Sequence, residues 1–302
     1  MLSWPQRDGD YVAPNPDDFG SNAFAVGSDA AQQAKAGALT LTWLSDSRVK
    51  GIEPRLLPMF DKLPATYTEF WGASPGEALT VFFLSDPETD GGAFHNSFAL
   101  RLATPLRASE ARVWEHTLAH ELMHTWMNNS NDGIRLGSGG QTYWFTEGFT
   151  DYLAAKLMHQ AGLADDEMYS QRLANQIRRY EFGRRLSPGV TLVGAGKEKH
   201  KNWELVYGGG AVMALLLDAE LSRTSPTAFR NALRRVQHQG AVTLDAPALL
   251  KLLDESSNGR ASAIMQQLDA GMSTAQLRAT LAPAGITVEG FATDEVYVGF
   301  TH

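Results

Sequence analysis

The chain of 302 residues contains no cysteine. Disulfide frameworks, thiol nucleophiles and cysteine-ligated metal sites are therefore excluded, and any metal must be held by histidine or carboxylate side chains. Its 28 glycines and 13 prolines are too few and too scattered for a collagen-like or low-complexity chain. The formal net charge of −8 disfavours binding to nucleic acid or to an anionic membrane surface.

Long apolar segments are also lacking. The longest notable run, Ala211 to Leu217, is far shorter than the roughly 20 residues of a membrane-spanning helix. The N-terminal residues show no apolar core of the signal-peptide type. We therefore expect no membrane span. The sequence leaves open the oligomeric state, and whether the protein is cytoplasmic or the mature or truncated form of a periplasmic or secreted chain.

The first third of the chain mixes strand and helix patterns. Residues 38–44, 78–84 and 96–103 have the alternating or continuous apolar pattern of strands. Residues 54–71 have the spacing of a helix that Pro64 kinks or splits. Residues 1–36 are polar and are expected to form an irregular arm.

Helical spacing dominates after Pro105, and the last residues, 284–300, carry short strand patterns. Helices are expected near residues 108–128, 144–162, 165–182, 204–223, 225–238, 245–256 and 261–270. The sequence therefore predicts an α+β fold. Residues 1–106 would form an N-terminal arm and small sheet lobe, and residues 107–302 a mainly helical lobe with short C-terminal strands.

The predicted helix 108–128 contains HELMH at residues 120–124. His120 and His124 are four residues apart, so both imidazoles project from one helix face and suit a single tetrahedral cation. Glu121 lies beside His120, angled toward a water near the metal rather than toward the metal itself. The alternative interpretation is a pair of hydrogen-bonded histidines on a helix face.

The next predicted helix offers a third ligand, because WFTEGFTDYLA at residues 144–154 contains Glu147. Two histidines and one carboxylate leave one coordination position open, which is the pattern of catalytic zinc. Asp151, one turn further on, is predicted to accept the free ring N–H of one histidine. The alternatives are a first-turn acid favoured by the helix dipole for Glu147, and the same with a surface salt bridge for Asp151.

His116 lies four residues before His120 and could form a second metal-binding pair with it. Residue 117 is threonine, so this pair would lack an adjacent general base. We therefore predict that His116 either supports a metal ligand from behind or is a buried, hydrogen-bonded residue.

Three segments in this order resemble the gluzincin zinc metallopeptidases. They are HELMHTW, WFTEGFTDYLA and, at residues 206–223, VYGGGAVMALLLDAELSR. The resemblance is greatest to the glycyl aminopeptidase family, a relative of aminopeptidase N and leukotriene A4 hydrolase. It implies a thermolysin-like catalytic unit, in which a small mixed sheet packs on the active-site helix, with one Zn²⁺ per chain and hydrolysis of a peptide or protein substrate. It also implies that Tyr207 donates to the oxyanion, whereas the alternative for Tyr207 is a packing role beside the glycines that follow it.

Residues 90–98, DGGAFHNSF, resemble the family's glycine-rich strand, which implies that Gly91, Gly92 and His95 bind substrate. The alternative for the two glycines is an ordinary turn. Phe94 stands where relatives carry the glutamate that grips the substrate amine, and the acids available to replace it are Asp86, Glu88 and Asp90. The predicted activity is therefore aminopeptidase-like without the usual amine anchor.

Three alternatives to this activity remain. One is an endopeptidase on the same scaffold, one is an inactive homologue that acts as a binding module, and one is another metal-dependent hydrolase such as an epoxide hydrolase. Relatives usually carry a β-rich domain before the catalytic region and often a PDZ domain after it, and 302 residues do not accommodate all three.

Overall fold

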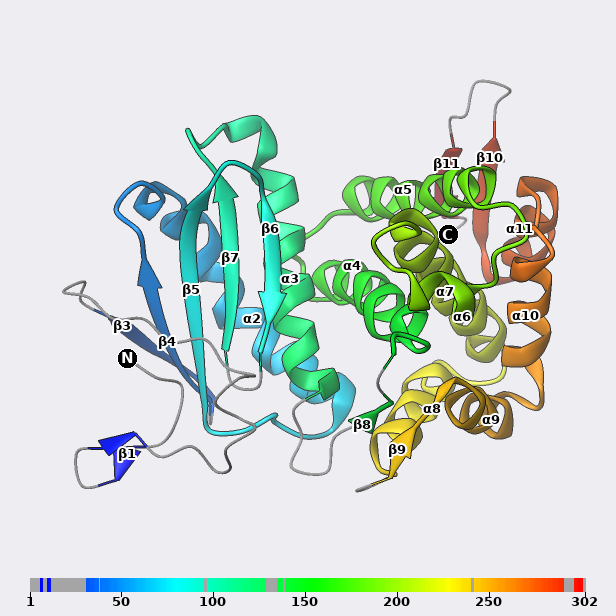
Figure 1. The fold of residues 1–302 in the computed structure, drawn as a ribbon, viewed down its shortest axis with the longest axis horizontal. Helices are drawn as coiled ribbons and strands as arrows, with labels where there is room; N and C mark the ends of the chain where they lie inside the picture. Colours follow the sequence, from blue (N-terminus) through cyan, green and yellow to red (C-terminus); the bar gives the residue numbers. More distant parts are fainter. Residues whose placement is uncertain are drawn as a thin grey trace. The chain divides into compact units, whose positions relative to one another are not determined.

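The computed structural model describes residues 6–7, 10–11, 31–37, 39–94, 97–128, 135–137, 139–239, 242–290 and 296–300. Two compact units divide the chain, Met1–Asn131 and Asp132–His302, and each is described by itself (Figure 1).

The first unit is built on a five-stranded mixed sheet in the order β3-β4-β5-β7-β6. Its central strands β4, β5 and β7 run parallel to one another, and the outer strands β3 and β6 pair antiparallel with their neighbours. The strands are β3 (Gln32–Ala36), β4 (Leu39–Ser45), β5 (Ala78–Asp86), β6 (Asp90–Ala93) and β7 (Ser97–Ala103), and two short strands, β1 (Gln6–Arg7) and β2 (Asp10–Tyr11), pair separately.

Three of these strands confirm the predictions for residues 38–44, 78–84 and 96–103. β3 was not expected, because it lies at the end of the segment predicted to be an irregular arm. Most of its side chains are exposed, so it lacks the apolar alternation that marks a half-buried strand.

Two long helices pack on this sheet. α2 (Glu53–Trp71), which follows the 3-10 turn η1 (Lys50–Ile52), lies against β3, and α3 (Ala111–Asn128), which follows the 3-10 turn η2 (Ala108–Glu110), lies against β6 and β7. Pro64 was predicted to kink or split this helix, and the split is wrong, because α2 runs on as one helix, whereas the kink stays a prediction. Its buried apolar face continues through Leu63, Pro64 and Tyr67, and this packing opposes the break.

Hydrogen bonds between α2 and α3 fix the position of α3. The Tyr67 hydroxyl donates to the carbonyl oxygen of Ala119 at 3.0 Å, and Trp71 Nε1 donates to Met123 Sδ at 3.3 Å. Trp126 Nε1 donates to Thr68 Oγ1 at 3.2 Å. Desolvation raises the pKa of Tyr67 well above its ordinary range, so this donor stays protonated at neutral pH.

The packing places α3 in the first unit, with the sheet. The sequence suggested a division after residue 106, before this helix, whereas the compact units divide between Asn131 and Asp132. The change from strand to helix patterns near residue 106 marks a change in secondary structure and is not the boundary between the units. α3 shares a core with the strands that precede it.

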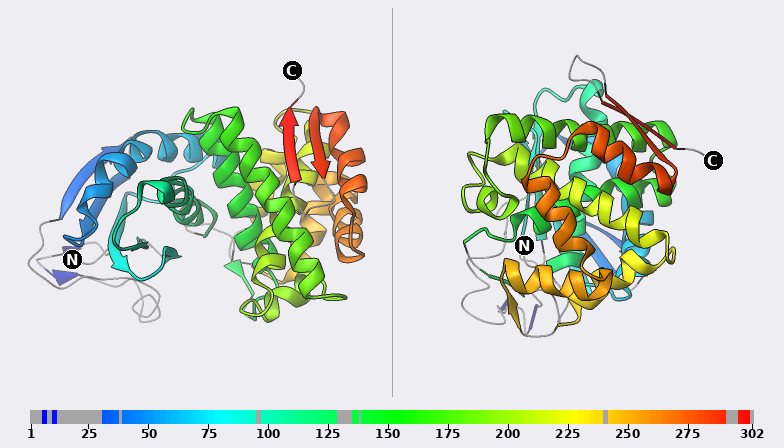
Figure 2. Two further views of the ribbon diagram at one scale, coloured as in Figure 1. Left: turned by 90° about the horizontal axis from the view of Figure 1, so that it is seen from above. Right: turned by 90° about the vertical axis from the view of Figure 1, so that its right-hand side faces the viewer.

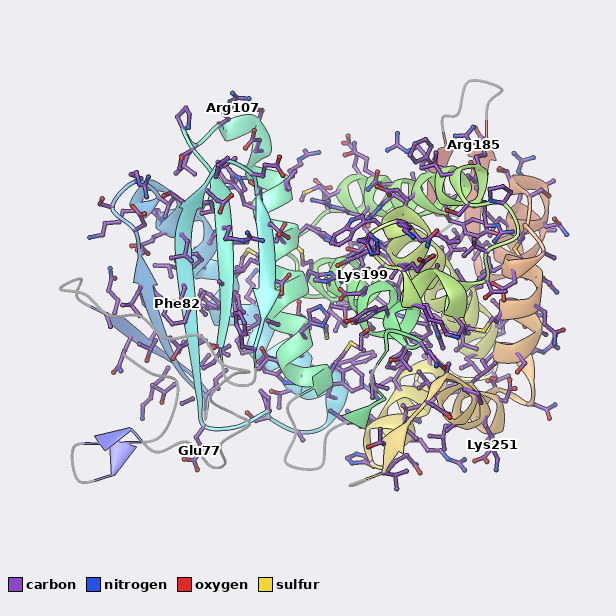
Figure 3. All side chains as sticks on the ribbon, in the orientation of Figure 1. Glu77, Phe82, Arg107, Arg185, Lys199 and Lys251 are labelled. Carbon is purple, nitrogen blue, oxygen red and sulfur yellow. The ribbon has the colours of Figure 1, made fainter. Side chains whose placement is uncertain are left out.

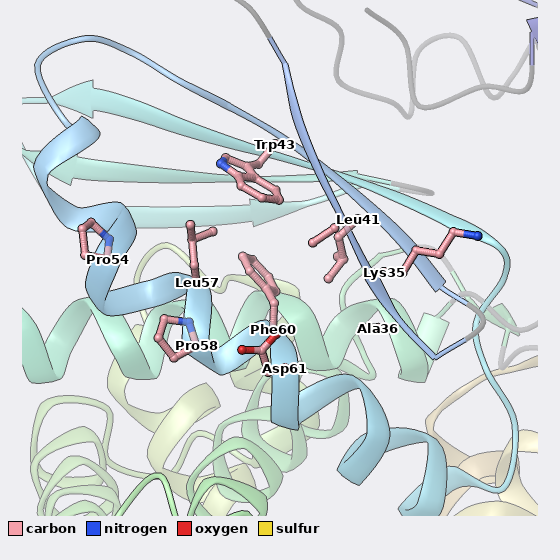
Figure 4. Close-up of a pocket in the computed structure, with 10 residues that line it drawn as sticks. Lys35, Ala36, Leu41, Trp43, Pro54, Leu57, Pro58, Phe60 and Asp61 are labelled. Carbon is pink, nitrogen blue, oxygen red and sulfur yellow. The ribbon is translucent and has the colours of Figure 1, made fainter.

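A pocket of about 330 Å³ lies between α2 and the β3–β4 edge of the sheet (Figure 4). Apolar side chains such as Leu41, Trp43 and Phe60 form most of its lining, with Lys35 and Asp61 as the charged residues. Among the described residues that line it, none belongs to the predicted metal site. It lies toward the edge of the sheet opposite β6.

The second unit is mainly helical, as predicted. The π-helical turn η3 (Trp144–Phe149) continues into α4 (Thr150–Gln160), and the π-helical turn η4 (Leu205–Gly209) continues into α7 (Gly210–Ser222). The other helices are α5 (Asp166–Leu186), α6 (Leu192–Lys197), α8 (Ala228–Gln237), α9 (Ala246–Ser257), α10 (Arg260–Asp269), α11 (Thr274–Leu281) and the 3-10 turn η5 (Ala282–Ala284).

Four short strands complete the second unit. β8 (Arg135–Leu136) pairs in parallel with β9 (Thr243–Leu244), and β10 (Ile286–Gly290) pairs antiparallel with β11 (Val296–Phe300). β11 packs on α5 and β10 on α11 (Figure 2). The strand patterns predicted for residues 284–300 are thereby confirmed.

The core of the second unit forms around α7. In the described part of the chain, Leu205–Ser222 is the one helical stretch long and apolar enough to cross a membrane, and 83% of it is buried within the fold. Glycine lets η3 approach it closely, since a Cβ on Gly210 would lie 1.9 Å from the carbonyl oxygen of Trp144. The segment is therefore explained as a core helix of the unit.

Candidate metal centre

His120 and His124 lie side by side on α3, and both are buried. Their Nε2 atoms are 3.0 Å apart, and their rings meet edge to face with centroids 4.7 Å apart. Two nitrogens on one tetrahedral zinc ion, each about 2.0–2.1 Å from the metal, lie about 3.3 Å from each other. The spacing of this pair is close to that value, and it is also the length of a hydrogen bond between the two rings.

His116 lies one turn before this pair, and its side chain is partly exposed. The centroids of the His116 and His120 rings are 6.5 Å apart, with the rings tilted by 52°. The His120–His124 pair is closer and has its nitrogens facing each other, so it is the better candidate for holding a metal.

Glu121 is buried and lies against the edge strand β6. A Cβ added to Gly91 would lie 2.3 Å from Glu121 Oε1, so glycine at this position lets the strand approach the carboxylate. A Cβ on Gly92, by contrast, would meet no atom within 4 Å among the residues described. His95, the third residue predicted to bind substrate, lies outside the described residues.

Arg101 on β7 forms ion pairs with Asp90 and Asp86, two of the three acids that the sequence suggested as binding groups for a substrate amine. Its guanidinium forms a close ion pair with the carboxylate of Asp90 and lies 3.8 Å from Asp86 Oδ2. Phe94, at the end of β6, is 39% exposed. These contacts leave Glu88 as the remaining acid suggested by the sequence.

Glu147 and Tyr207 each lie on a π-helical turn of the second unit, η3 and η4, and the two turns contact each other. Isolated π-helical turns are rare and are frequent at functional sites. The sequence pattern predicted ordinary α-helices here. Periodicity does not resolve one extra residue in a helical turn, so the π-helical geometry was missed.

Lys199, which no sequence motif singled out, forms an ion pair with Glu147 and is labelled in Figure 3. Its Nζ donates to Glu147 Oε1 at 2.7 Å. The same ammonium lies 4.9 Å from the ring centroids of Tyr143 and Trp203 and 5.1 Å from that of Tyr207. Lys199, Trp203 and Tyr207 are four residues apart in the sequence, a spacing that could have suggested that they lie together. The contact of Lys199 with Glu147 depends on the packing of distant segments and leaves no spacing signal.

The rings and charges around Tyr207 hold its side chain in place. Trp203 stacks on the Tyr207 ring with centroids 4.6 Å apart, and the Arg179 guanidinium lies 4.9 Å from the ring centroid. Arg179 also pairs with Glu204 at 2.6 Å. This environment orients the ring of Tyr207 and is compatible with a defined direction for its hydroxyl group.

Asp151, on α4, is buried. One of its oxygens, Oδ2, accepts a hydrogen bond of 3.1 Å from Nε2 of Gln176, a residue that is itself buried on α5. Gln176 therefore orients this carboxylate, and the bond from Asp151 to a histidine stays a prediction.

Comparisons with known proteins identify the class of protein that this chain resembles. The family model described as M61 glycyl aminopeptidase matches residues 114–192, a segment that contains His120, Glu121, His124 and Glu147. A search of curated proteins gave no match.

Solved structures of an aminopeptidase N family protein and of a zinc metallopeptidase share the fold. An aminopeptidase N family protein from Idiomarina loihiensis is 18% identical with a TM-score of 0.72, over 87% of this chain and 50% of that one. An M1 zinc metallopeptidase from Deinococcus radiodurans is 17% identical with a TM-score of 0.57, over 79% of this chain and 50% of that one. A mutant of the latter, bound to a Tyr-Ser-Ala substrate, is 17% identical with a TM-score of 0.56, over 82% of this chain and 53% of that one.

The chain therefore resembles the gluzincin-type zinc peptidases, and the predicted α+β fold is confirmed. It spans about half the length of the solved structures it matches.

Proposed function

We propose that the protein is a zinc-dependent peptidase, aminopeptidase-like in architecture, that hydrolyses peptide bonds of a peptide or protein substrate. The observation that carries the proposal is the pair of imidazole nitrogens 3.0 Å apart, next to a buried glutamate on the same helix. The match of residues 114–192 to a peptidase family model supports it.

His120, His124 and Glu147 would hold one zinc ion per chain. Two nitrogens and one carboxylate oxygen are donors that zinc accepts, and three protein ligands leave a position for water or substrate. A zinc ion bound there supplies Lewis-acid chemistry, polarising a carbonyl group and acidifying water.

The remaining steps fall to side chains of the protein. Glu121 accepts a proton from the attacking water and later delivers it to the leaving amine nitrogen. The Tyr207 hydroxyl donates a hydrogen bond to the oxygen that gains negative charge as the carbonyl carbon becomes tetrahedral. Asp151 and His116 support the ligands through hydrogen bonds, which keep the imidazoles in one orientation.

The substrate backbone would add to β6, the outer strand of the described sheet, beside Gly91 and Gly92, because an edge strand offers its peptide groups to an extended chain. A role of His95 in binding substrate, which the resemblance implies, concerns a residue outside the described part of the chain. The ion pairs of Arg101 with Asp90 and Asp86 favour a second candidate, an endopeptidase, because they occupy acids that could otherwise bind a substrate amine.

Metal analysis and peptide hydrolysis test the proposal together. We expect one zinc ion per chain in protein purified without added metal, and cleavage of a quenched peptide library that a chelator abolishes. Glu121→Gln should keep its zinc and lose about 10²–10⁴-fold in rate, since it removes the proton acceptor and preserves shape.

Each contradictory outcome has a distinct meaning. A protein that neither contains nor takes up zinc would contradict the metal site. Stoichiometric zinc without peptide turnover would indicate a binding module or a different hydrolase. A Glu121→Gln variant that cleaves at the wild-type rate would contradict the assigned proton transfer.

A further inference from the structure

Lys199 lies in a well-anchored turn between α6 and η4. The backbone N–H of Lys201 donates to the carbonyl oxygen of Glu198 at 2.9 Å, and the N–H of Asn202 donates to that of Lys199 at 3.1 Å. Asn202 is buried and accepts a hydrogen bond of 2.6 Å from the Ser187 hydroxyl, at the end of α5. The backbone that carries Lys199 is therefore tied to two elements of the second unit.

The ammonium group of Lys199 is confined on several sides. Three aromatic rings, those of Tyr143, Trp203 and Tyr207, have their centroids within 5.1 Å of Nζ, and Glu147 Oε1 accepts its hydrogen bond. The side chains of Lys199 and Glu147 are 23% and 12% exposed, so water screens this pair less than it screens an ion pair at the surface.

Neighbouring charges leave this pairing intact. Arg179 is the other cation on the Tyr207 ring, and its guanidinium is directed to Glu204 at 2.6 Å. Lys201, two residues further along the same turn, pairs with Glu198 at 2.7 Å and is 60% exposed. Lys199 is thus the lysine of this turn that faces Glu147.

We infer that Lys199 is a positioning residue for Glu147, which holds one carboxylate oxygen so that the other is presented to the metal. The inference rests on the proposed function. An ionised carboxylate has two oxygens with about four acceptor sites, so a hydrogen bond to Oε1 is compatible with metal binding through Oε2. Groups that orient a metal ligand in this way act on metal affinity as well as on activity.

Lys199 could instead compete with the metal for the same carboxylate. The two roles predict opposite changes in zinc affinity when the ammonium is removed. If Lys199 withdrew Glu147 from the metal, removing the ammonium would tighten zinc binding. If it positions Glu147, removing the ammonium takes away one of the groups that hold the carboxylate in place and weakens zinc binding.

Zinc affinity, measured by competition with a fluorescent zinc chelator, separates the two roles. We expect Lys199→Met to weaken zinc binding about 10–100-fold. Lys199→Arg should restore most of the affinity, since a guanidinium donates to carboxylates and stacks on aromatic rings. Lys201→Met removes the same charge from the same turn without touching Glu147, and it should bind zinc as the wild type does.

The absorption spectrum of the Co²⁺-substituted protein adds a readout that a purely structural role would not move. Lys199→Met should alter the ligand-field bands through the reoriented carboxylate, and Lys201→Met should leave them unchanged. Circular dichroism of the metal-free proteins checks folding, and Lys199→Ala replaces Lys199→Met if the latter does not fold.

Two outcomes overturn the inference, and they are distinguishable. Wild-type protein that binds zinc, together with a folded Lys199 variant of equal or higher zinc affinity, overturns the positioning role alone. Wild-type protein that binds no zinc overturns the proposed function and the positioning role together.

Discussion

The side chain of Tyr207 is held in one orientation by its neighbours. Trp203 stacks on its ring at 4.6 Å, and the cations of Arg179 and Lys199 lie about the same ring at 4.9 and 5.1 Å. These contacts all involve the aromatic ring, and the hydroxyl is the group that we propose acts on a substrate. Removal of the hydroxyl alone therefore separates chemistry from packing.

Tyr207→Phe should lower kcat by about 10²–10³-fold, the usual effect of losing one donor to a developing oxyanion. KM should change little, because the donor acts mainly in the transition state. Steady-state kinetics on one peptide measures both. The phenylalanine ring keeps the stacking with Trp203, so an unchanged kcat would assign Tyr207 to packing.

At the scale of single residues, the sequence predicts the relative positions of side chains that lie within one or two turns of the same helix. The spacing of His120, Glu121 and His124 fixes their relation on α3 wherever the helix packs. Lys199 and Gln176 were not predicted, because each meets its partner, Glu147 or Asp151, through the packing of separate elements. Such contacts leave no spacing signal in the chain.

At the scale of elements, one glycine allows the edge strand β6 to pack closely on α3. Gly91 lets the edge strand lie against the carboxylate of Glu121, where a Cβ would be 2.3 Å from Oε1. Gly92, the next residue of the same strand, has open space around the position of a Cβ. An alanine substitution at Gly92 is therefore a matched comparison for the same substitution at Gly91.

Gly91→Ala should lower kcat/KM much more than Gly92→Ala, because its methyl group displaces Glu121, the side chain that we propose transfers the proton. A loss of at least tenfold, about 1.4 kcal/mol of transition-state stabilisation, is expected for Gly91→Ala relative to Gly92→Ala. Equal losses in the two variants would show that the strand rather than Glu121 is affected. Zinc content, measured in both, controls for damage to the metal site.

Elements with a clear apolar pattern were predicted from the sequence, and several short or exposed ones were not. α2, α3, α5 and α7 carry many buried apolar residues, and their patterns predicted them. α6 spans six residues and includes two glycines, so it offers little periodicity. β3 is exposed, and Pro64 suggested a break in α2 that core packing overrides.

At the scale of the whole molecule, a net charge of −8 does not by itself place an acid where a substrate's cationic end would bind. Arg101 engages Asp90 and Asp86, and the sequence resemblance predicts that Phe94 stands where relatives carry a glutamate. Burying an ammonium without a partner costs several kcal/mol. An aromatic face such as that of Phe94 attracts a cation by only about 0.5–2 kcal/mol.

We therefore predict that peptides with a blocked N-terminus are cleaved at least as well as those with a free amine. The measurement is kcat/KM for one peptide with free and acetylated N-termini. A preference of a hundredfold for the free amine, about 2.7 kcal/mol, would contradict this and show that an anchor exists. In that case the variant Glu88→Gln tests which group binds the amine. Among the described contacts, Arg101 does not engage Glu88. Loss of the preference in this variant would identify Glu88 as the group that binds the amine.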